Sequence, residues 1–115
     1  MWTVYGLKNC DTCRSALKWL SERGRDATLH DVRRDGIPPD RLTAWMKTVG
    51  WEVLLNKRGT TWRGISDVEK ENMDEKTARE LILTYPALMK RPVFDRGDIV
   101  LVGFKEPQKT AILDA

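Results

Sequence analysis

The chain has 115 residues, of which 41% are hydrophobic and 32% charged, and its formal net charge is +3 at pH 7. This composition fits one globular domain with its own core and is too apolar for a disordered chain. The longest aliphatic run, residues 99–102, is too short to cross a bilayer, and no basic stripe marks a nucleic-acid surface. The first residues also lack the order of a signal peptide, so we expect a cytoplasmic protein that binds neither membrane nor nucleic acid.

The first third of the chain has the pattern of a strand, a helix and a second strand. Residues 3–5 are β-branched or aromatic and stop at Gly6, which predicts a strand. The next apolar residues have the i, i+3, i+4, i+7 spacing of one helix face: Cys13, Ala16, Leu17 and Leu20. Gly24 is predicted to end that helix, and residues 28–32 form a second strand. Together these elements indicate a right-handed βαβ unit.

The middle of the chain is predicted to be helical. One helix begins near Pro39 and ends at Gly50, and another is capped by Asp74 and ends before Pro86. Their apolar faces carry Leu42, Trp45, Met46 and Val49 in the first, and Ala78, Leu81, Ile82 and Tyr85 in the second. Residues 93–94 and 99–102 then predict a β-hairpin with a glycine in its turn, followed by a helix over about 106–113.

This order of elements predicts an α/β protein with a thioredoxin-like fold. A βαβ half and a ββα half would enclose a helical insertion. We therefore expect a single domain of residues 1–115, with a thioredoxin-like core of about 1–33 and 86–115 and an insertion of about 37–85.

The two cysteines of the chain, Cys10 and Cys13, form a C-x-x-C at the junction of the first strand and helix. Structural zinc needs four ligands, and His30 is the one histidine available, so we expect no metal. In the cytoplasm such a pair is more often catalytic than a structural disulfide.

Cys10 is expected to be the reactive thiol. A helix N-terminus lowers a cysteine pKa from ~8.5 to as little as ~3.5–7.5, and Lys8 and Arg14 add positive charge while Asp11 opposes it. Cys13 lies on the apolar face of its helix. It is either a resolving thiol or a buried filler of the core, and the sequence leaves both readings open.

Four segments carry a resemblance to a known family: "VYGLKNCDTCRSALKWL", "LLNKRGTTWR", "PALMKRPV" and "VLVGF". In this order they resemble the arsenate reductase/Spx family, and within it the YffB-type members. The resemblance implies a thioredoxin-like fold with a helical insertion and Cys10 as the nucleophile. It also implies that Arg91 is an anion-binding arginine beside that cysteine and that Pro92 is a cis-proline facing the active site.

The function that follows is a cytoplasmic thiol–disulfide oxidoreductase, a glutathione-dependent thiol reductase that acts on a small thiol or disulfide. Glutathione would be the co-substrate, and no metal would take part. Lys8, Asn9 and Arg58 would join Arg91 and Pro92 in binding the substrate or glutathione.

Two alternatives stay open. Cys10 and Cys13 resemble the redox switch of the Spx regulators, which bind RNA polymerase, so the chain could instead sense redox state and bind a protein partner. Arsenate reduction is weaker, because two arginines of the related arsenate reductases are replaced here by Asn56 and Gly103. The sequence does not name the substrate.

Overall fold

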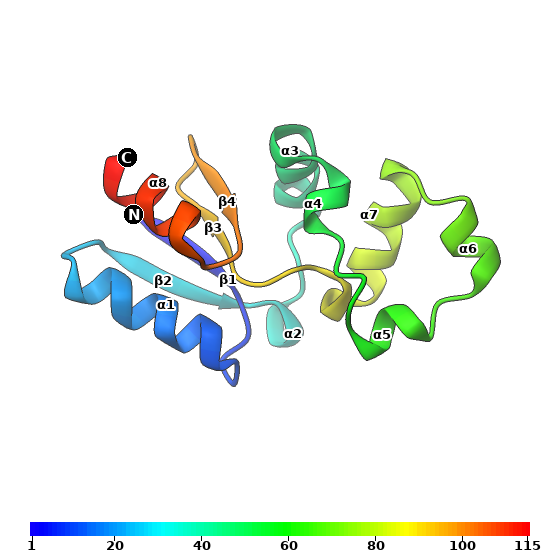
Figure 1. Cartoon of the computed structure of the whole chain (residues 1–115), viewed down its shortest axis with the longest axis horizontal. Coiled ribbons are helices and arrows are strands. Elements are labelled where there is room, and N and C mark those ends of the chain that lie inside the picture. The colour runs from blue at the N-terminus through cyan, green and yellow to red at the C-terminus, as the bar shows by residue number, and fades with distance from the viewer. The chain divides into compact units, whose positions relative to one another are not determined.

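The computed structural model describes residues 1–115 and divides them into two compact units, whose elements are labelled in Figure 1. The first unit joins the two ends of the chain, Met1–Asp35 and Arg91–Ala115, and the second is Gly36–Lys90. The expectation of a single domain stays a prediction. None of the helices has the length and apolar character needed to cross a membrane.

A four-stranded sheet forms the centre of the first unit. Its strands are β1 (Trp2–Gly6), β2 (Ala27–Asp31), β3 (Val93–Asp95) and β4 (Val100–Val102), in the order β2-β1-β3-β4. Strand β1 runs parallel to β2, with Gly6 beside Asp31, and antiparallel to β3, with Tyr5 beside Val93. The carboxyl ends of β1 and β2 and the start of β3 therefore lie together at one end of the sheet. The predicted βαβ and ββα halves are both present.

The core of this unit joins the sheet to helices α1 (Asp11–Glu22) and α8 (Glu106–Asp114). Its fully or nearly fully buried members are Trp2, Val4, Ala16, Leu20, Phe94 and Ile112. Burying a side chain of the size of leucine or phenylalanine contributes about 1.5–3 kcal/mol. The two chain ends are thus held together by one apolar cluster, which packs the middle and the last turns of α1 against the sheet.

Helix α1 ends as predicted at Gly24. This glycine has φ +69°, a conformation that other residues adopt at a cost. Its N–H donates to the carbonyl of Ser21 at 3.1 Å, and the N–H of Arg25 donates to Leu20 at 2.9 Å. These two bonds form a Schellman motif, which satisfies carbonyls at the end of the helix.

The second unit is helical. Its elements are α3 (Pro39–Val49), α4 (Trp51–Leu54), α5 (Thr60–Arg63), α6 (Asp67–Glu71), α7 (Glu75–Thr84) and the 3₁₀ turn η1 (Pro86–Leu88). The predicted cap of α7 is confirmed, because the Asp74 carboxylate accepts the N–H of Thr77 at 2.8 Å. A single β-bridge between Leu55 and Met89 ties α4 to the segment that leaves the unit.

Two residues depart from the predicted pattern. Tyr85 was expected on the buried face of α7 but is 48% exposed. It precedes Pro86, which disfavours helical backbone at Tyr85, so the helix ends at Thr84 and the ring leaves the apolar face. Val32 was placed on the second strand but begins the short helix α2 (Val32–Asp35), where it is buried.

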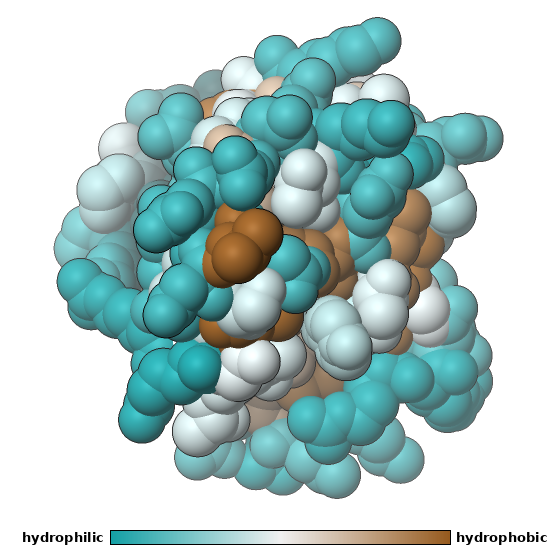
Figure 2. All heavy atoms as spheres, turned by 90° about the vertical axis from the view of Figure 1, so that its right-hand side faces the viewer, coloured by the Kyte–Doolittle hydropathy of each residue, from teal (hydrophilic) through white to brown (hydrophobic).

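Exposed apolar side chains are sparse on the second unit. The three large ones are Val53, Val68 and Tyr85. Figure 2 views the right-hand side of Figure 1 and shows a mainly hydrophilic surface with small, separate apolar areas. Scattered apolar residues of this kind are ordinary on a protein surface.

Candidate active site

The loop of residues 7–10 leads from the end of β1 into helix α1, and it presents Cys10 at the N-cap position. The backbone of Cys10 is extended, with φ −103° and ψ 122°, and helical geometry begins at Asp11. The carbonyl of Cys10 accepts the N–H of Arg14 at 3.0 Å, which is the first bond of the helix. No side-chain hydrogen bond caps α1, so the N–H groups of its first turn are left to interact with the sulfur.

The environment of the half-buried Cys10 favours its thiolate. Partial burial raises the pKa of Cys10, but the N–H and thiol of Cys13, the N–H of Thr12 and the Arg91 guanidinium together hold this pKa below its ordinary value of 9.0. A thiolate is the form that attacks disulfides. Cys10 therefore has the exposure and the electrostatics of a nucleophile.

Cys13 has the opposite character. It is fully buried, and burial raises the pKa of its thiol to about 11, with further increase from the Cys10 sulfur. Its sulfur packs directly against the backbone of Gly6, where any side chain would overlap it. The N–H of Leu7 also interacts with this sulfur. At neutral pH Cys13 is a protonated thiol whose sulfur packs against the start of the loop, at Gly6 and Leu7.

Arg91 reaches the site from the opposite end of the sequence. It lies two residues before β3, and its peptide bond to Pro92 is cis, as expected. The carbonyl of Pro92 accepts the N–H of Gly103 at 2.9 Å, which links this turn to the end of β4. Since β3 pairs with β1, the half-buried Arg91 side chain comes to the sulfur of Cys10.

The other cations expected beside Cys10 are placed differently. Arg14 forms an ion pair with Asp11, and both side chains are largely exposed. Lys8 and Asn9 are exposed, and neither side chain is among the groups that lower the pKa of Cys10. The loop is held by its backbone instead: the N–H of Cys10 donates to the carbonyl of Leu7 at 3.2 Å.

Arg58 belongs to the second unit, as does Trp62. The N–H of Arg58 donates to the side chain of Asn56 at 3.1 Å, and the guanidinium is exposed. The ring of Trp62 is flanked by the ammonium groups of Lys57 and Lys70, at 5.8 and 5.2 Å from its centre. The indole therefore has two cationic neighbours within its own unit.

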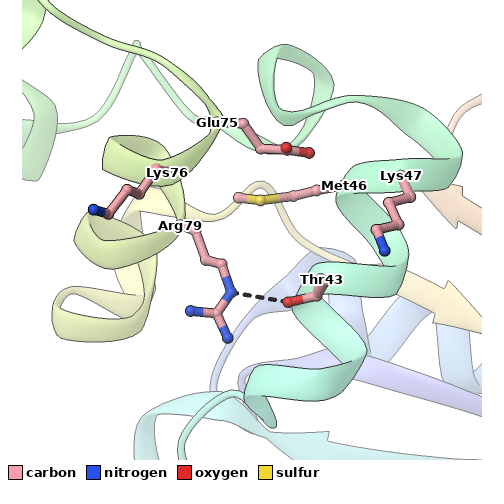
Figure 3. Close-up of a pocket in the computed structure, with 6 residues that line it drawn as sticks. All are labelled: Thr43, Met46, Lys47, Glu75, Lys76 and Arg79. Atoms are coloured by element: carbon pink, nitrogen blue, oxygen red, sulfur yellow. Dashed lines mark hydrogen bonds between the residues drawn. The ribbon is translucent and has the colours of Figure 1, made fainter.

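A pocket of about 270 Å³ lies between α3 and α7 in the second unit. Figure 3 shows Met46 at its centre and the Arg79 guanidinium held toward α3, where its Nε donates to the Thr43 hydroxyl at 2.9 Å. Its charged lining residues carry both signs: Lys47, Lys76 and Arg79 against Glu75. No cysteine or histidine lines it, so it offers no thiol chemistry.

Sequence reasoning missed two residues that shape the site. Gly6 was predicted only as the end of a strand, yet it makes room for the Cys13 sulfur. Asp31 was placed in the second strand, yet its carboxylate accepts the N–H of Lys8 at 3.0 Å. The usable signal was an aspartate at the end of a strand, just before residues that can start a helix turn.

The four-stranded sheet with its helices defines a thioredoxin-like fold. The site on it is of the thiol oxidoreductase type: a cysteine of lowered pKa lies at a helix N-terminus, beside an arginine that precedes a cis-proline. Residues 5–112 match the ArsC family, and the chain belongs to that family. This confirms the resemblance seen in the sequence.

The chain is also similar to three known proteins over nearly its whole length. An uncharacterized protein of Haemophilus influenzae is 43% identical over 96% of this chain and 97% of its own length. A solved YffB protein is 39% identical, with a TM-score of 0.88 over 96% of this chain and 97% of that one. The global transcriptional regulator Spx of Streptococcus pyogenes is 25% identical over 98% of this chain and 85% of the regulator.

Proposed function

We propose that this protein is a glutathione-dependent thiol–disulfide oxidoreductase in which Cys10 is the nucleophile. The single observation that carries the proposal is the lowered pKa of a half-buried Cys10 beside the Arg91 guanidinium. A nucleophile of this kind needs a large thiolate fraction near neutral pH and an open path to its substrate. Membership of the ArsC family agrees with thiol chemistry.

The reaction proceeds in two exchanges. The Cys10 thiolate attacks one sulfur of a mixed disulfide between glutathione and a small thiol. A bond forms between Cys10 and the glutathione sulfur, the original S–S bond breaks, and the released thiolate takes a proton from water. A second glutathione thiolate then attacks the adduct, which frees Cys10 and forms oxidised glutathione. The net reaction converts the mixed disulfide and one free glutathione into the free substrate thiol and oxidised glutathione, so one S–S bond is broken and one is formed.

Arg91 has two roles in this scheme. Its guanidinium stabilises the Cys10 thiolate between turnovers, as the lowered pKa of Cys10 reflects. It also offers its remaining donors to a carboxylate of glutathione, since arginine is suited to binding carboxylates with paired hydrogen bonds. Pro92 follows Arg91 directly before β3, and the contributions assigned to Pro92, Lys8, Asn9 and Arg58 stay predictions.

The properties of Cys13 favour glutathione as the resolving thiol. Burial raises the pKa of Cys13 to about 11, so its thiol is protonated at neutral pH and is a poor nucleophile. Cys13 is also fully buried, with its sulfur against Gly6. A glutathione thiolate arriving from solvent meets neither restriction.

A redox-sensing regulator is the second candidate, and one specific observation favours it. The two cysteines lie three residues apart and their sulfurs interact, so a disulfide between them needs little rearrangement. Spx, a relative by sequence, is a transcriptional regulator. In this candidate, oxidation to a Cys10–Cys13 disulfide would change the surface offered to a protein partner.

Arsenate reduction is less well supported. An arsenate bound at Cys10 needs several fixed donors for its oxygens, each charge-assisted bond contributing roughly 1.5–3 kcal/mol. Gly103 has φ +93°, which disfavours an arginine at that position. The side chain of Asn56 is engaged with the N–H of Arg58.

Mass spectrometry after equilibration with oxidised glutathione tests the proposal. We expect a glutathione adduct on Cys10, retained in Cys13→Ala and absent in Cys10→Ser. A Cys10–Cys13 disulfide without adduct would favour the regulator. If neither cysteine reacts, both candidates fail.

A further inference from the structure

Asp31 makes a side-chain hydrogen bond that ties the backbone of the Cys10 loop to a distant part of the sequence. Its Oδ2 accepts the N–H of Lys8 at 3.0 Å, across 23 positions of the chain. Because Asp31 pairs with Gly6 in the parallel register of β1 and β2, its carboxylate stands beside the point where the loop leaves β1. The loop reaches Cys10 two residues beyond Lys8.

The same carboxylate also starts the next helix. Its Oδ1 accepts the N–H groups of Arg33 and Arg34, at 2.9 and 3.1 Å. These bonds fix the carboxylate from one side while Lys8 binds it from the other. The three N–H donors, that of Lys8 first, lower the pKa of Asp31, so it accepts all three bonds at neutral pH.

We propose that Asp31 is a positioning residue for Cys10. The Asp31 carboxylate anchors residues 7–10 to the end of β2, and this anchor aligns the Cys10 sulfur with the first turn of α1 and with Arg91. The inference rests on the proposed function, because it takes Cys10 as the reactive thiol. Asp31 acts through the backbone of Lys8 and touches no substrate.

The direction of the effect separates this role from simple electrostatics. A negative charge near Cys10 disfavours the thiolate, so removing Asp31 by charge alone would lower the pKa of Cys10. Loss of the anchor lets the loop move, which weakens the alignment of the sulfur with its N–H donors and with Arg91. The inference therefore requires the pKa of Cys10 to rise when Asp31 is replaced.

The decisive variant is Asp31→Ser. Serine is a good N-cap and keeps one acceptor for the start of α2, but its single short side chain cannot also reach Lys8. Asp31→Asn, with one acceptor oxygen on a side chain of the same length, should give a smaller effect. Each variant has a control. Asp74→Ser makes the same substitution at a capping carboxylate of the second unit, and Asp35→Asn removes a negative charge from the nearby helix α2.

The readouts are the pH profile of Cys10 alkylation by iodoacetamide, located by peptide mass mapping, and amide hydrogen exchange at Lys8. In Asp31→Ser we expect a higher pKa of Cys10, a rate at pH 6 reduced by about threefold or more, and faster exchange at Lys8. The controls should keep the wild-type profile. Circular dichroism confirms folding, and Asp31→Asn carries the test if the serine variant does not fold.

Two outcomes would overturn the inference, and they are distinguishable. An ordinary Cys10 pKa in the wild-type protein would remove the basis of the proposed function and of this inference with it. A low wild-type pKa that stays the same or falls in both Asp31 variants would refute the positioning role alone.

Discussion

Replacing Gly6 by alanine probes the contact that seats Cys13 beneath the active loop. A methyl group at Gly6 would lie well within 3.0 Å of the Cys13 sulfur, whereas its next neighbours are the Cys13 Cβ at 3.4 Å and the Leu29 Cδ1 at 4.0 Å. Nonbonded carbon atoms normally stay about 3.5–4.0 Å apart. The clash is therefore with one atom, and removing that atom should relieve it.

The expected magnitudes follow from this geometry. Overpacking by one methyl group in a close-packed core costs about 1–3 kcal/mol, and Gly6→Ala should lose this much, less about 0.4–1 kcal/mol gained from the stiffer unfolded chain. Cys13→Ala removes one fully buried sulfur and should cost about 1 kcal/mol. In the double variant the new methyl group occupies space left by the sulfur, so the two changes should couple by about 1–3 kcal/mol in the stabilising direction.

Urea unfolding of the four proteins, followed by circular dichroism, measures this coupling as a double-mutant cycle. We expect Gly6→Ala to be strongly destabilising alone and nearly neutral in the Cys13→Ala background. Equal effects of Gly6→Ala in both backgrounds would refute the packing of the Cys13 sulfur against Gly6.

Three further predictions concern the site. The pKa of Cys13 is about 11 in the folded protein and 9.0 in the unfolded chain. The stability that Cys13 contributes is therefore complete below pH 9 and is lost as the pH rises toward 11. Urea unfolding across this range should show a decrease in the free energy of unfolding that is smaller in Cys13→Ala. Arg91→Ala should unfold within about 0.5 kcal/mol of wild type yet react roughly tenfold more slowly with oxidised glutathione, and a large stability loss with unchanged kinetics would make Arg91 structural. Arsenate turnover should be absent even with glutathione and glutaredoxin, and robust turnover by the wild-type protein would promote that function.

The long helices and the strands could be predicted because their patterns are periodic. Helix α3 buries Leu42 and Trp45 at helical spacing, and α7 begins at the cap expected for Asp74. The short helices α4, α5 and α6 were missed, because four or five residues carry too little periodicity to reveal a helix.

At the site, the sequence predicted the features that depend on neighbouring residues of one segment. It missed the contacts that depend on how two side chains or two strands pair. Cys10 was found because a strand followed by a helix places it at a helix N-terminus. Arg14 was expected to add positive charge near Cys10, but Asp11 lies one helical turn before Arg14 and forms an ion pair with its guanidinium. Asp31 was missed because its bond to Lys8 depends on the register between β1 and β2, which single-chain periodicity does not specify.

The first unit is assembled from the two ends of the chain, and this has a consequence for synthesis on the ribosome. Cys10 is made early, whereas Arg91 and strand β3, which pairs with β1, are made about 80 residues later. At about 5–20 residues per second, this interval is roughly 4–16 s. During that time Cys10 lacks the arginine that helps to lower its pKa, and the central strand lacks one neighbour. The environment that favours the Cys10 thiolate is therefore completed long after Cys10 itself has been made.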